Sequence, residues 1–410
     1  MGWLRKRIVG VSIYLLGLGP FLLSVWAFDD DHAINFPDFN RENFLDIKSY
    51  QFRKQLEDQW YETESGWRGT GGSLGLDQLY VLFELKIRRP LSEFVTLEAR
   101  MEQETFYAIK PLEQVLVELE IQAGPPLTIS FLGRPAYDKR QADIGGAVTL
   151  GKRPWNYLKY TYLEQDLFYN EKNFVDASYY DRFPVETRLE GAYQWKSLFQ
   201  SRFDWSQSRP FTQQFPEHQV LFTYEGNEGK VVLDYFYHSP NLIGLTYRGF
   251  DVRKARLATS EVSPENRYQN LLWNSLDLYW LFSLESNDSI TLGFQYDQFQ
   301  NRLRDLKDIN QDFNYHLQTL QTYAILLSPQ TPTMAWEYAL YIGEAEEATD
   351  FLKEMNPDKR SRGMESKLRI SWEYHTVQGK DTLLLSTTWN LDNLLRDFWD
   401  GGNVSYQTMF

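Results

Sequence analysis

Acidic and basic side chains recur at every second position in several parts of the chain. Two such series are Glu98, Arg100, Glu102 and Glu186, Arg188, Glu190. Residues two apart in an extended strand point to the same face of a sheet, so each series forms a ladder of charges. A ladder of carboxylates concentrates cations and repels anions. Alternatively, glutamate and arginine on neighbouring strands pair with each other and only make that face hydrophilic.

The residue types that usually carry out catalysis or bind metal ions are scattered or missing. The histidines are His32, His218, His238, His316 and His375, and none has a second histidine at metal-ligand spacing. The chain has no cysteine, which excludes disulfides, thiolate metal sites and covalent haem attachment. The G-x-S-x-G motif of serine hydrolases is absent. We therefore predict no catalytic residue, no metal site and no cofactor, so that any redox group would belong to a partner.

A repeated alternation of apolar and polar residues predicts the elements that carry the charges. One run is Leu79, Val81, Phe83, Leu85, Ile87, and another is Val115, Val117, Leu119, Ile121. Similar runs follow each other from residue 46 onward, with polar residues at the intervening positions. Strands with one apolar and one polar face give this pattern, and many such strands in succession are the signature of a transmembrane β-barrel.

The connections between the runs alternate between short and long. Gly124-Pro125-Pro126 and Gln378-Gly379-Lys380 are short turns, whereas 169–183 and 239–267 are long and polar. Bacterial barrels have short periplasmic turns and longer extracellular loops. We predict an all-β fold, a closed antiparallel transmembrane barrel of about 18 strands, with about 16 as the alternative. The predicted strands are 46–60, 74–87, 93–104, 112–122, 126–132, 142–151, 155–168, 184–195, 198–206, 217–226, 230–238, 268–285, 289–301, 313–327, 333–343, 364–375, 382–391 and 402–410.

Three segments are predicted to lie outside the strands. Gly226-Asn227-Glu228-Gly229 is predicted to form a short turn. Leu242 to Val252 alternates as well, but we place it inside the long extracellular connection 239–267, which is also our candidate for a loop that folds inward and narrows the lumen. Glu344 to Met355 has the composition of a short helix that ends at Asn356-Pro357.

The last predicted strand carries a specific pattern. Val404, Tyr406, Thr408 and Phe410 share one face, and Ser405, Gln407 and Met409 share the other. A final strand that ends in phenylalanine, with tyrosine four positions earlier, resembles the terminal strand of Gram-negative outer-membrane β-barrels. In those proteins this strand is the signal that the barrel-insertion machinery reads. The resemblance covers the pattern of the chain from residue 46 to 410, and no motif of a single porin family is matched.

The beginning of the chain predicts export. Arg5, Lys6 and Arg7 precede an apolar run from Ile8 to Phe28, and Ala27 is a suitable cleavage residue. We expect a signal peptide at 1–27, a polar leader at 28–45 and the barrel at 46–410. An uncleaved membrane anchor is the alternative, because the run is long enough to span a bilayer. The mean hydropathy of −0.50 and the aromatic content of 16% suit a barrel with aromatic girdles.

If the apolar face meets lipid, the charged face lines the lumen. The predicted lumen-lining residues are Glu98, Arg100, Glu102, Glu118, Glu120, Glu186, Arg188, Glu190, Arg202, Asp204, Asp234, Glu337, Arg369 and Glu373, and Glu225 is placed on the same face. Acids outnumber bases in this set. The first hypothesis is an acidic-lined, porin-like channel for small solutes or an exported polymer. Alginate-export porins are similar in strand number, but a route for a polyanion should be basic.

The second hypothesis is a structural sheath around a partner protein, such as a multihaem cytochrome in an electron-transfer conduit. The expected partners are outer-membrane lipid and lipopolysaccharide, the barrel-insertion machinery, and, under the second hypothesis, a lumen-bound or periplasmic protein. The net charge of −14 argues against a nucleic-acid partner. The expected location is the bacterial outer membrane.

Overall fold

The computed structural model describes residues 65–410, except 75–77, 107–111, 136–141, 154, 169–177, 217–218, 239, 259–265, 285–286, 306–312, 352–358, 378–379 and 393–397. The predicted signal peptide, the polar leader and the predicted strand 46–60 lie outside these residues. None of the described residues forms a helix that is long and apolar enough to cross a membrane.

The described chain folds into one antiparallel sheet of 19 strands. The first nine are β1 (Gly66–Leu74), β2 (Gln78–Pro90), β3 (Val95–Phe106), β4 (Leu112–Gly124), β5 (Leu127–Arg134), β6 (Asp143–Gly151), β7 (Tyr157–Glu164), β8 (Tyr179–Arg182) and β9 (Val185–Trp195). The others are β10 (Phe199–Phe215), β11 (Val220–His238), β12 (Asn241–Ala258), β13 (Arg267–Ser283), β14 (Ser289–Asp305), β15 (Phe313–Thr331), β16 (Met334–Phe351), β17 (Lys359–His375), β18 (Asp381–Asn390) and β19 (Trp399–Met409).

The sheet closes on itself. Each strand pairs with the next along the chain, and β1 pairs with β19 from Gly66 opposite Met409 to Leu74 opposite Gly401. Strand β8 is the exception, because it pairs with the far end of β10 while β7 pairs directly with β9. The closed circuit therefore contains 18 of the 19 strands. Closure satisfies the backbone amides that an open sheet would leave unpaired in hydrocarbon, at several kcal/mol each. The predicted fold class and the strand number are confirmed.

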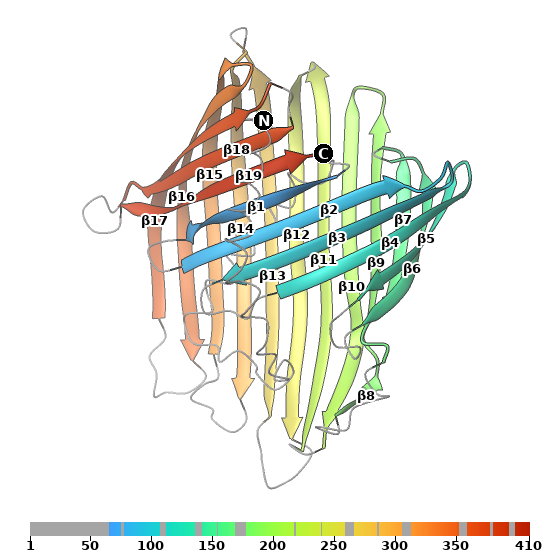
Figure 1. Cartoon of the computed structure of the whole chain (residues 1–410). Coiled ribbons are helices and arrows are strands. Elements are labelled where there is room, and N and C mark those ends of the chain that lie inside the picture. Colours follow the sequence, from blue (N-terminus) through green and yellow to red (C-terminus); the bar gives the residue numbers. More distant parts are fainter. Residues whose placement is uncertain are drawn as a thin grey trace, which may run out of the picture. The chain divides into compact units, whose positions relative to one another are not determined.

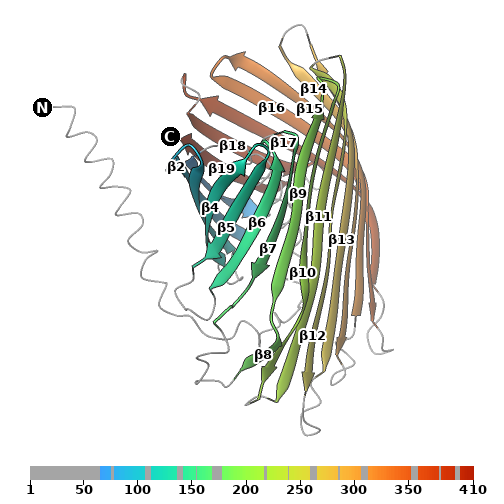
Figure 2. The ribbon, with the colours of Figure 1, turned by 90° about the vertical axis from the view of Figure 1, so that its right-hand side faces the viewer.

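The wall of the barrel is uneven in height. Strand β15 has 19 residues, whereas β5 has 8. In Figures 1 and 2 the long strands β10–β16 form the tall side, and the shorter strands β1–β7 form the low side. At about 3.3 Å per residue, the long strands exceed what is needed to cross an apolar band about 25 Å tall. Their length therefore leaves room for a segment beyond such a band, on the side of the long connections.

Three predictions about individual segments are wrong. The predicted turn at 226–229 lies inside β11, paired on one side with β10 and on the other with β12. The segment placed in an inward-folding loop is strand β12, which pairs with β11 and β13 along most of its length. The predicted helix from Glu344 is the end of β16 as far as Phe351, where it pairs with β15 and β17. In each case hydrogen bonds from two neighbouring strands outweigh the local turn or helix preference.

The first strand was not predicted. The predicted strands 46–60 and 74–87 leave 61–73 as a connection, but β1 occupies Gly66–Leu74 and lies between β2 and β19. Its sequence, GWRGTGGSL, has little preference for a strand because glycine is depleted in strands. The predicted strands 217–226 and 230–238 are one strand, β11, in the structure, which lowers the predicted number of strands by one. The strand β12 was not predicted and raises the number by one, so these two errors cancel.

Candidate functional site

The two faces of the sheet differ sharply in chemistry. On β2–β4 the side chains of Val81, Met101 and Val115 are exposed and apolar, whereas Glu84 and Glu118 at alternate positions are buried. On the face that carries Glu84 and Glu118, ion pairs also join strands that are not neighbours. For example, Arg88 on β2 contacts Glu120 on β4 at 2.6 Å. Side chains meet across an intervening strand most readily on the concave side of a sheet, which in a closed barrel is the interior. The charged face therefore points inward.

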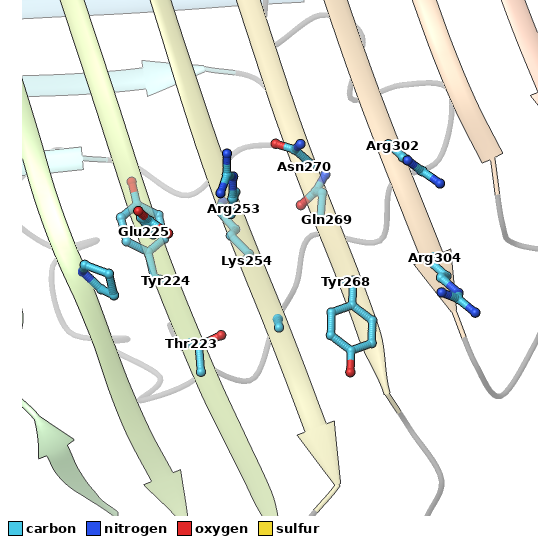
Figure 3. A pocket seen from close by; sticks show the side chains of 12 residues that line it. Thr223, Tyr224, Glu225, Arg253, Lys254, Tyr268, Gln269, Asn270, Arg302 and Arg304 are labelled. Atoms are coloured by element: carbon cyan, nitrogen blue, oxygen red, sulfur yellow. The ribbon is translucent and has the colours of Figure 1, made fainter.

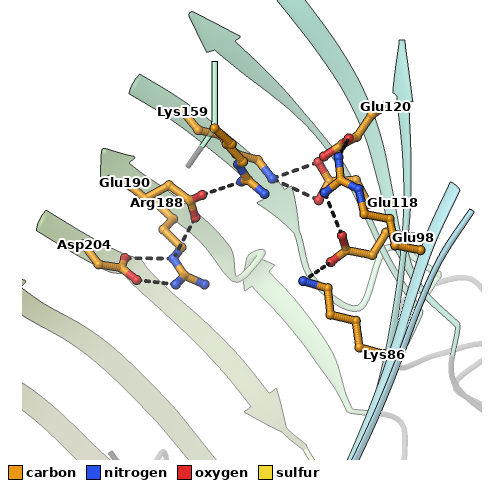
Figure 4. A network of polar contacts seen from close by, with 10 residues as sticks. Lys86, Glu98, Glu118, Glu120, Lys159, Arg188, Glu190 and Asp204 are labelled. Carbon is orange, nitrogen blue, oxygen red and sulfur yellow. Dashed lines mark hydrogen bonds and ion pairs between the residues drawn. The ribbon is translucent and has the colours of Figure 1, made fainter. Parts of the chain in front are cut away.

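A cluster of charged residues extends over the inner face of the barrel from β2 to β10 (Figure 4). We call it the charged cluster, and its members are Lys86, Arg88, Glu98, Glu118, Glu120, Arg153, Lys159, Arg188, Glu190 and Asp204. Five are basic and five are acidic. The carboxylates of the cluster are thus matched one for one by cations, and the cluster adds little net charge to the wall.

The most buried pair of the cluster links distant strands. Lys159 Nζ on β7 donates to both carboxylate oxygens of Glu118 on β4, at 2.8 and 2.9 Å. Strands β5 and β6 lie between them and present the small residues Ser130 and Ala147, which are buried. Both charged side chains are less than 10% exposed, at 6% for Lys159 and 7% for Glu118. This pair braces the inner face over the width of four strands.

The other members of the cluster form two chains of ion pairs. Glu98 lies 3.6 Å from Lys86 and 3.3 Å from Arg88. Glu190 accepts from Arg153 at 2.6 Å and lies 3.6 Å from Arg188. Arg188 in turn forms a two-bond ion pair with Asp204.

Arg153 belongs to the turn between β6 and β7, outside the strands. Burial alone lowers the pKa of its guanidinium, but the combined effect of Glu190, Tyr157, Glu118 and Glu120 outweighs burial and raises that pKa above its ordinary value. Arg153 therefore stays positively charged at neutral pH.

The remaining predicted lumen residues have separate contacts. Arg100 pairs with Glu84 at 2.7 Å, and Glu186 pairs with Arg134 at 3.1 Å. Arg202 stacks on the ring of Trp155, with 4.3 Å between the guanidinium carbon and the ring centre. Glu102 lies in β3, but its side chain is outside the described part of the structure.

On the tall side of the barrel the predicted residues are far apart in the sheet. Arg369 contacts Glu337 at 2.8 Å, and His375 lies 3.1 Å from Glu373. Asp234 accepts a hydrogen bond from the Tyr279 hydroxyl at 2.7 Å. Glu225, which we placed in the lumen, lies on the outer face instead, because β11 turns its even-numbered residues inward along with Asp234.

Tyrosines lie flat against the inner face of the tall side. The ring of Tyr279 on β13 crosses Gly244 on β12 and reaches Asp234 on β11. The ring of Tyr323 on β15 crosses Gly293 on β14 in the same way, and its hydroxyl donates to Asp277 on β13 at 2.8 Å. Glycine is required at both crossings, since a Cβ at Gly293 would lie 2.0 Å from Cζ of Tyr323. Each unit ties three strands together.

Sequence reasoning missed several residues of the inner face. Arg88 lies just beyond the predicted strand 74–87, although β2 continues to Pro90. Lys159 carries a usable signal, because it is the single cation in the strand YLKYTYLE, which is mostly aromatic and apolar apart from Thr161 and Glu164. Gly244 and Gly293 give no local signal of their own, since the tyrosine that covers each lies more than 25 positions later in the chain.

The residues of the predicted insertion signal lie in and directly after β19. Val404 and Phe410 are exposed, at 52% and 64%. The hydroxyl groups of Tyr406 and Thr408 both donate to Asp381, at 3.0 and 2.6 Å. The alternate residue Ser405 is buried and accepts a hydrogen bond from Thr70 of β1 at 2.8 Å. The side chain of Phe410 is therefore available for recognition, whereas its neighbours in β19 hold the closing strand.

We expect Phe410→Ser to lower the amount of barrel assembled in cells while leaving the stability of the refolded barrel unchanged, because the exposed ring contributes little to packing. Heat-modifiable migration on gels measures assembly, and urea unfolding of refolded protein measures stability. Val377→Ser is the matched control, since Val377 is an apolar residue, 91% exposed, outside the last strand. Normal assembly of the Phe410 variant in cells would rule out a role in insertion.

No protein-family model matches the sequence, and no curated protein matches it. Among solved structures, the chain is similar to Pseudomonas aeruginosa OccK10 (OpdN), with 11% identity over 85% of this chain and 98% of that chain and a TM-score of 0.41. It is similar to a structure described as a bacterial polysaccharide outer membrane secretin, with 10% identity, 85% and 99% coverage and a TM-score of 0.39. It is also similar to a loop-deletion mutant of Vibrio cholerae OmpT, with 7% identity over 84% of this chain and 98% of that chain and a TM-score of 0.37.

The outer face of the barrel is suited to lipid. Leu292 and Phe294 on β14, and Tyr338, Leu340 and Ile342 on β16, are exposed and apolar. Near the short turns, Trp336 stacks with Tyr338 and Trp372 with Tyr374, which places aromatic rings at one edge of the apolar band. A closed barrel with an apolar exterior, aromatic edges and a charged interior is what a lipid bilayer permits in a β protein. The chain is a transmembrane β-barrel.

Proposed function

We propose that the barrel is a porin-like channel that gives hydrophilic solutes a route across the outer membrane. The observation that carries this proposal is the closed circuit of 18 strands with charged and polar side chains on its inner face. Barrels of 16 to 18 strands are wide enough to enclose an aqueous channel. A role without catalysis agrees with the contacts of the charged cluster, whose carboxylates are held by cations.

The ion pairs change the expected selectivity. An unpaired ladder of carboxylates would attract cations strongly, but the paired cations cancel most of this field. Salt at 0.1 M screens the remaining field over about 10 Å. We therefore propose a weak preference for cations that arises from the net charge of −14 rather than from a ring of bare acids. Small neutral or cationic solutes fit this wall better than a polyanion.

The purified barrel is expected to conduct in planar lipid bilayers, with a severalfold preference for K⁺ over Cl⁻ in a salt gradient. The reversal potential measures this preference. Lys159→Met is expected to raise it, because the substitution removes a cation from the inner face. A barrel that does not conduct, or that prefers anions, contradicts the proposal. Stoichiometric copurification of a partner that absorbs as haem would favour the sheath instead.

A further inference from the structure

A basic depression lies on the outer face of the tall side, beyond the apolar band (Figure 3). It has a volume of about 520 Å³ and crosses β11–β14, next to Pro210 of β10. Of the described lining residues in outward-facing positions, Arg253, Arg302 and Arg304 are basic and Glu225 is the single acid, whereas Lys254 lies in the inward phase with Tyr224. An excess of positive charge on the outer surface calls for an anionic occupant.

The register of the strands arranges the lining in two rows. Glu225, Arg253, Asn270 and Arg302 stand opposite one another in the first row, and Thr223, Ala255, Tyr268 and Arg304 do so in the second. The side chains of Arg302, Arg304, Asn270 and Tyr268 therefore sit at the corners of a square across β13 and β14. We call these four residues the donor square. All four are exposed, and none of them is acidic.

The chemistry of the donor square fits a phosphate attached to a polar headgroup. Guanidinium groups bind phosphate through two parallel hydrogen bonds, and two of them two positions apart on one face can share one phosphate group. The Asn270 amide and the Tyr268 hydroxyl supply further donors beside them. Arg253 is held by Asp251 at 3.1 Å, so we assign it to the rim rather than to the contact itself.

The height of the donor square selects the kind of lipid. On the outer face of β13 and β14, Leu276 is paired with Tyr296. Toward the donor square, this is the last pair in which both residues are large and apolar or aromatic. Arg302 follows Tyr296 by six positions. Six residues span about 20 Å along a strand, and about 15 Å along the membrane normal after the tilt of the strands. The headgroup zone of a phospholipid is only about 5 to 8 Å deep. A phosphorylated glycolipid reaches this height.

We propose that the donor square binds a phosphate on the sugar headgroup of an outer-leaflet glycolipid. The geometry gives Arg302 and Arg304 the phosphate, and Asn270 and Tyr268 the adjoining sugar oxygens. The acyl chains of the same lipid would lie below, against the exposed apolar residues of β13 and β14, such as Leu276 and Phe294. This site is independent of whether the barrel conducts.

The test is native mass spectrometry of the detergent-purified barrel with added phosphorylated lipid A that carries its inner-core sugars. The wild type is expected to retain this lipid, and Arg302→Ala/Arg304→Ala is expected to bind it at least about tenfold more weakly, because charge-assisted contacts are lost. Arg362→Ala is the matched control, since Arg362 is an exposed arginine that pairs with Glu344 instead. Gel migration before and after heating confirms that each variant is folded.

Two further arms separate the sources of the phosphate. Enzymatically dephosphorylated lipid of the same kind should lose affinity for the wild type and show no difference between the wild type and the double variant. Inorganic pyrophosphate should compete only at far higher concentration than the glycolipid. Equal retention by wild type and double variant overturns the proposal, as does retention that does not depend on phosphate, or pyrophosphate binding as tight as that of the lipid.

Discussion

Replacement of Lys159 by methionine is expected to lower the free energy of unfolding by about 3 to 5 kcal/mol, because it leaves the buried carboxylate of Glu118 without its partner. The cost arises from desolvation of an unpaired charge rather than from loss of packing, since methionine preserves most of the volume. Urea unfolding of the barrel in lipid vesicles, followed by tryptophan fluorescence, measures the change.

Two variants separate the ion pair from general damage at this position. Glu118→Gln/Lys159→Met removes both charges and is expected to recover most of the lost stability, since replacing a whole buried pair is often neutral. Arg362→Met breaks an exposed pair with Glu344 and is expected to change stability very little. If Lys159→Met is as stable as Arg362→Met, the bridge across β4–β7 does not stabilise the barrel.

Gly293→Ala is expected to destabilise the barrel by about 2 to 4 kcal/mol, because its new methyl group would occupy the space of the Tyr323 ring. The ring must leave, and its hydrogen bond to Asp277 is then lost. The Asp277 carboxylate on the inner face then loses the hydrogen bond from the Tyr323 hydroxyl. The same unfolding measurement applies.

A double-mutant cycle identifies the cause. In a Tyr323→Ser background the ring is absent, so Gly293→Ala should then have almost no cost. Gly363→Ala is the matched control, because a Cβ at Gly363 meets no atom within 4 Å. An equal loss of stability in both backgrounds would show that the tyrosine ring is not the reason for glycine at this position.

The lipid-facing part of the fold was predictable, and the part above it was not. Within the apolar band each strand must alternate, so runs such as Leu79 to Ile87 reveal strands directly. Beyond the band both faces meet water and the alternation stops, although the strand continues. Segment 226–229 and the end of β16 after Glu344 lie in this polar region, and both were misassigned.

The candidate site was predictable to a similar degree. The alternation of apolar and polar residues in the sequence predicts that side chains such as those of Glu118 and Glu190 lie on the inner face. It did not give their partners, because Lys159 lies three strands away from Glu118 in the sheet and 41 positions away in the chain. The donor square was not predicted for the same reason: Arg302 and Tyr268 meet only through the register of β13 with β14.

The seam between β1 and β19 has a consequence for biogenesis. It joins residues that are 327 to 343 positions apart, and glycine is frequent in β1, so that backbone hydrogen bonds rather than side-chain packing hold much of it. A chain that lacks β19 would leave β1 and β18 as two bare edges, which hydrocarbon does not tolerate. A nascent polypeptide that stops short of its final strand thus has no stable membrane-embedded form. Closure of the ring thus depends on β19, and we expect a chain that ends before Trp399 to leave the edges of β1 and β18 unpaired.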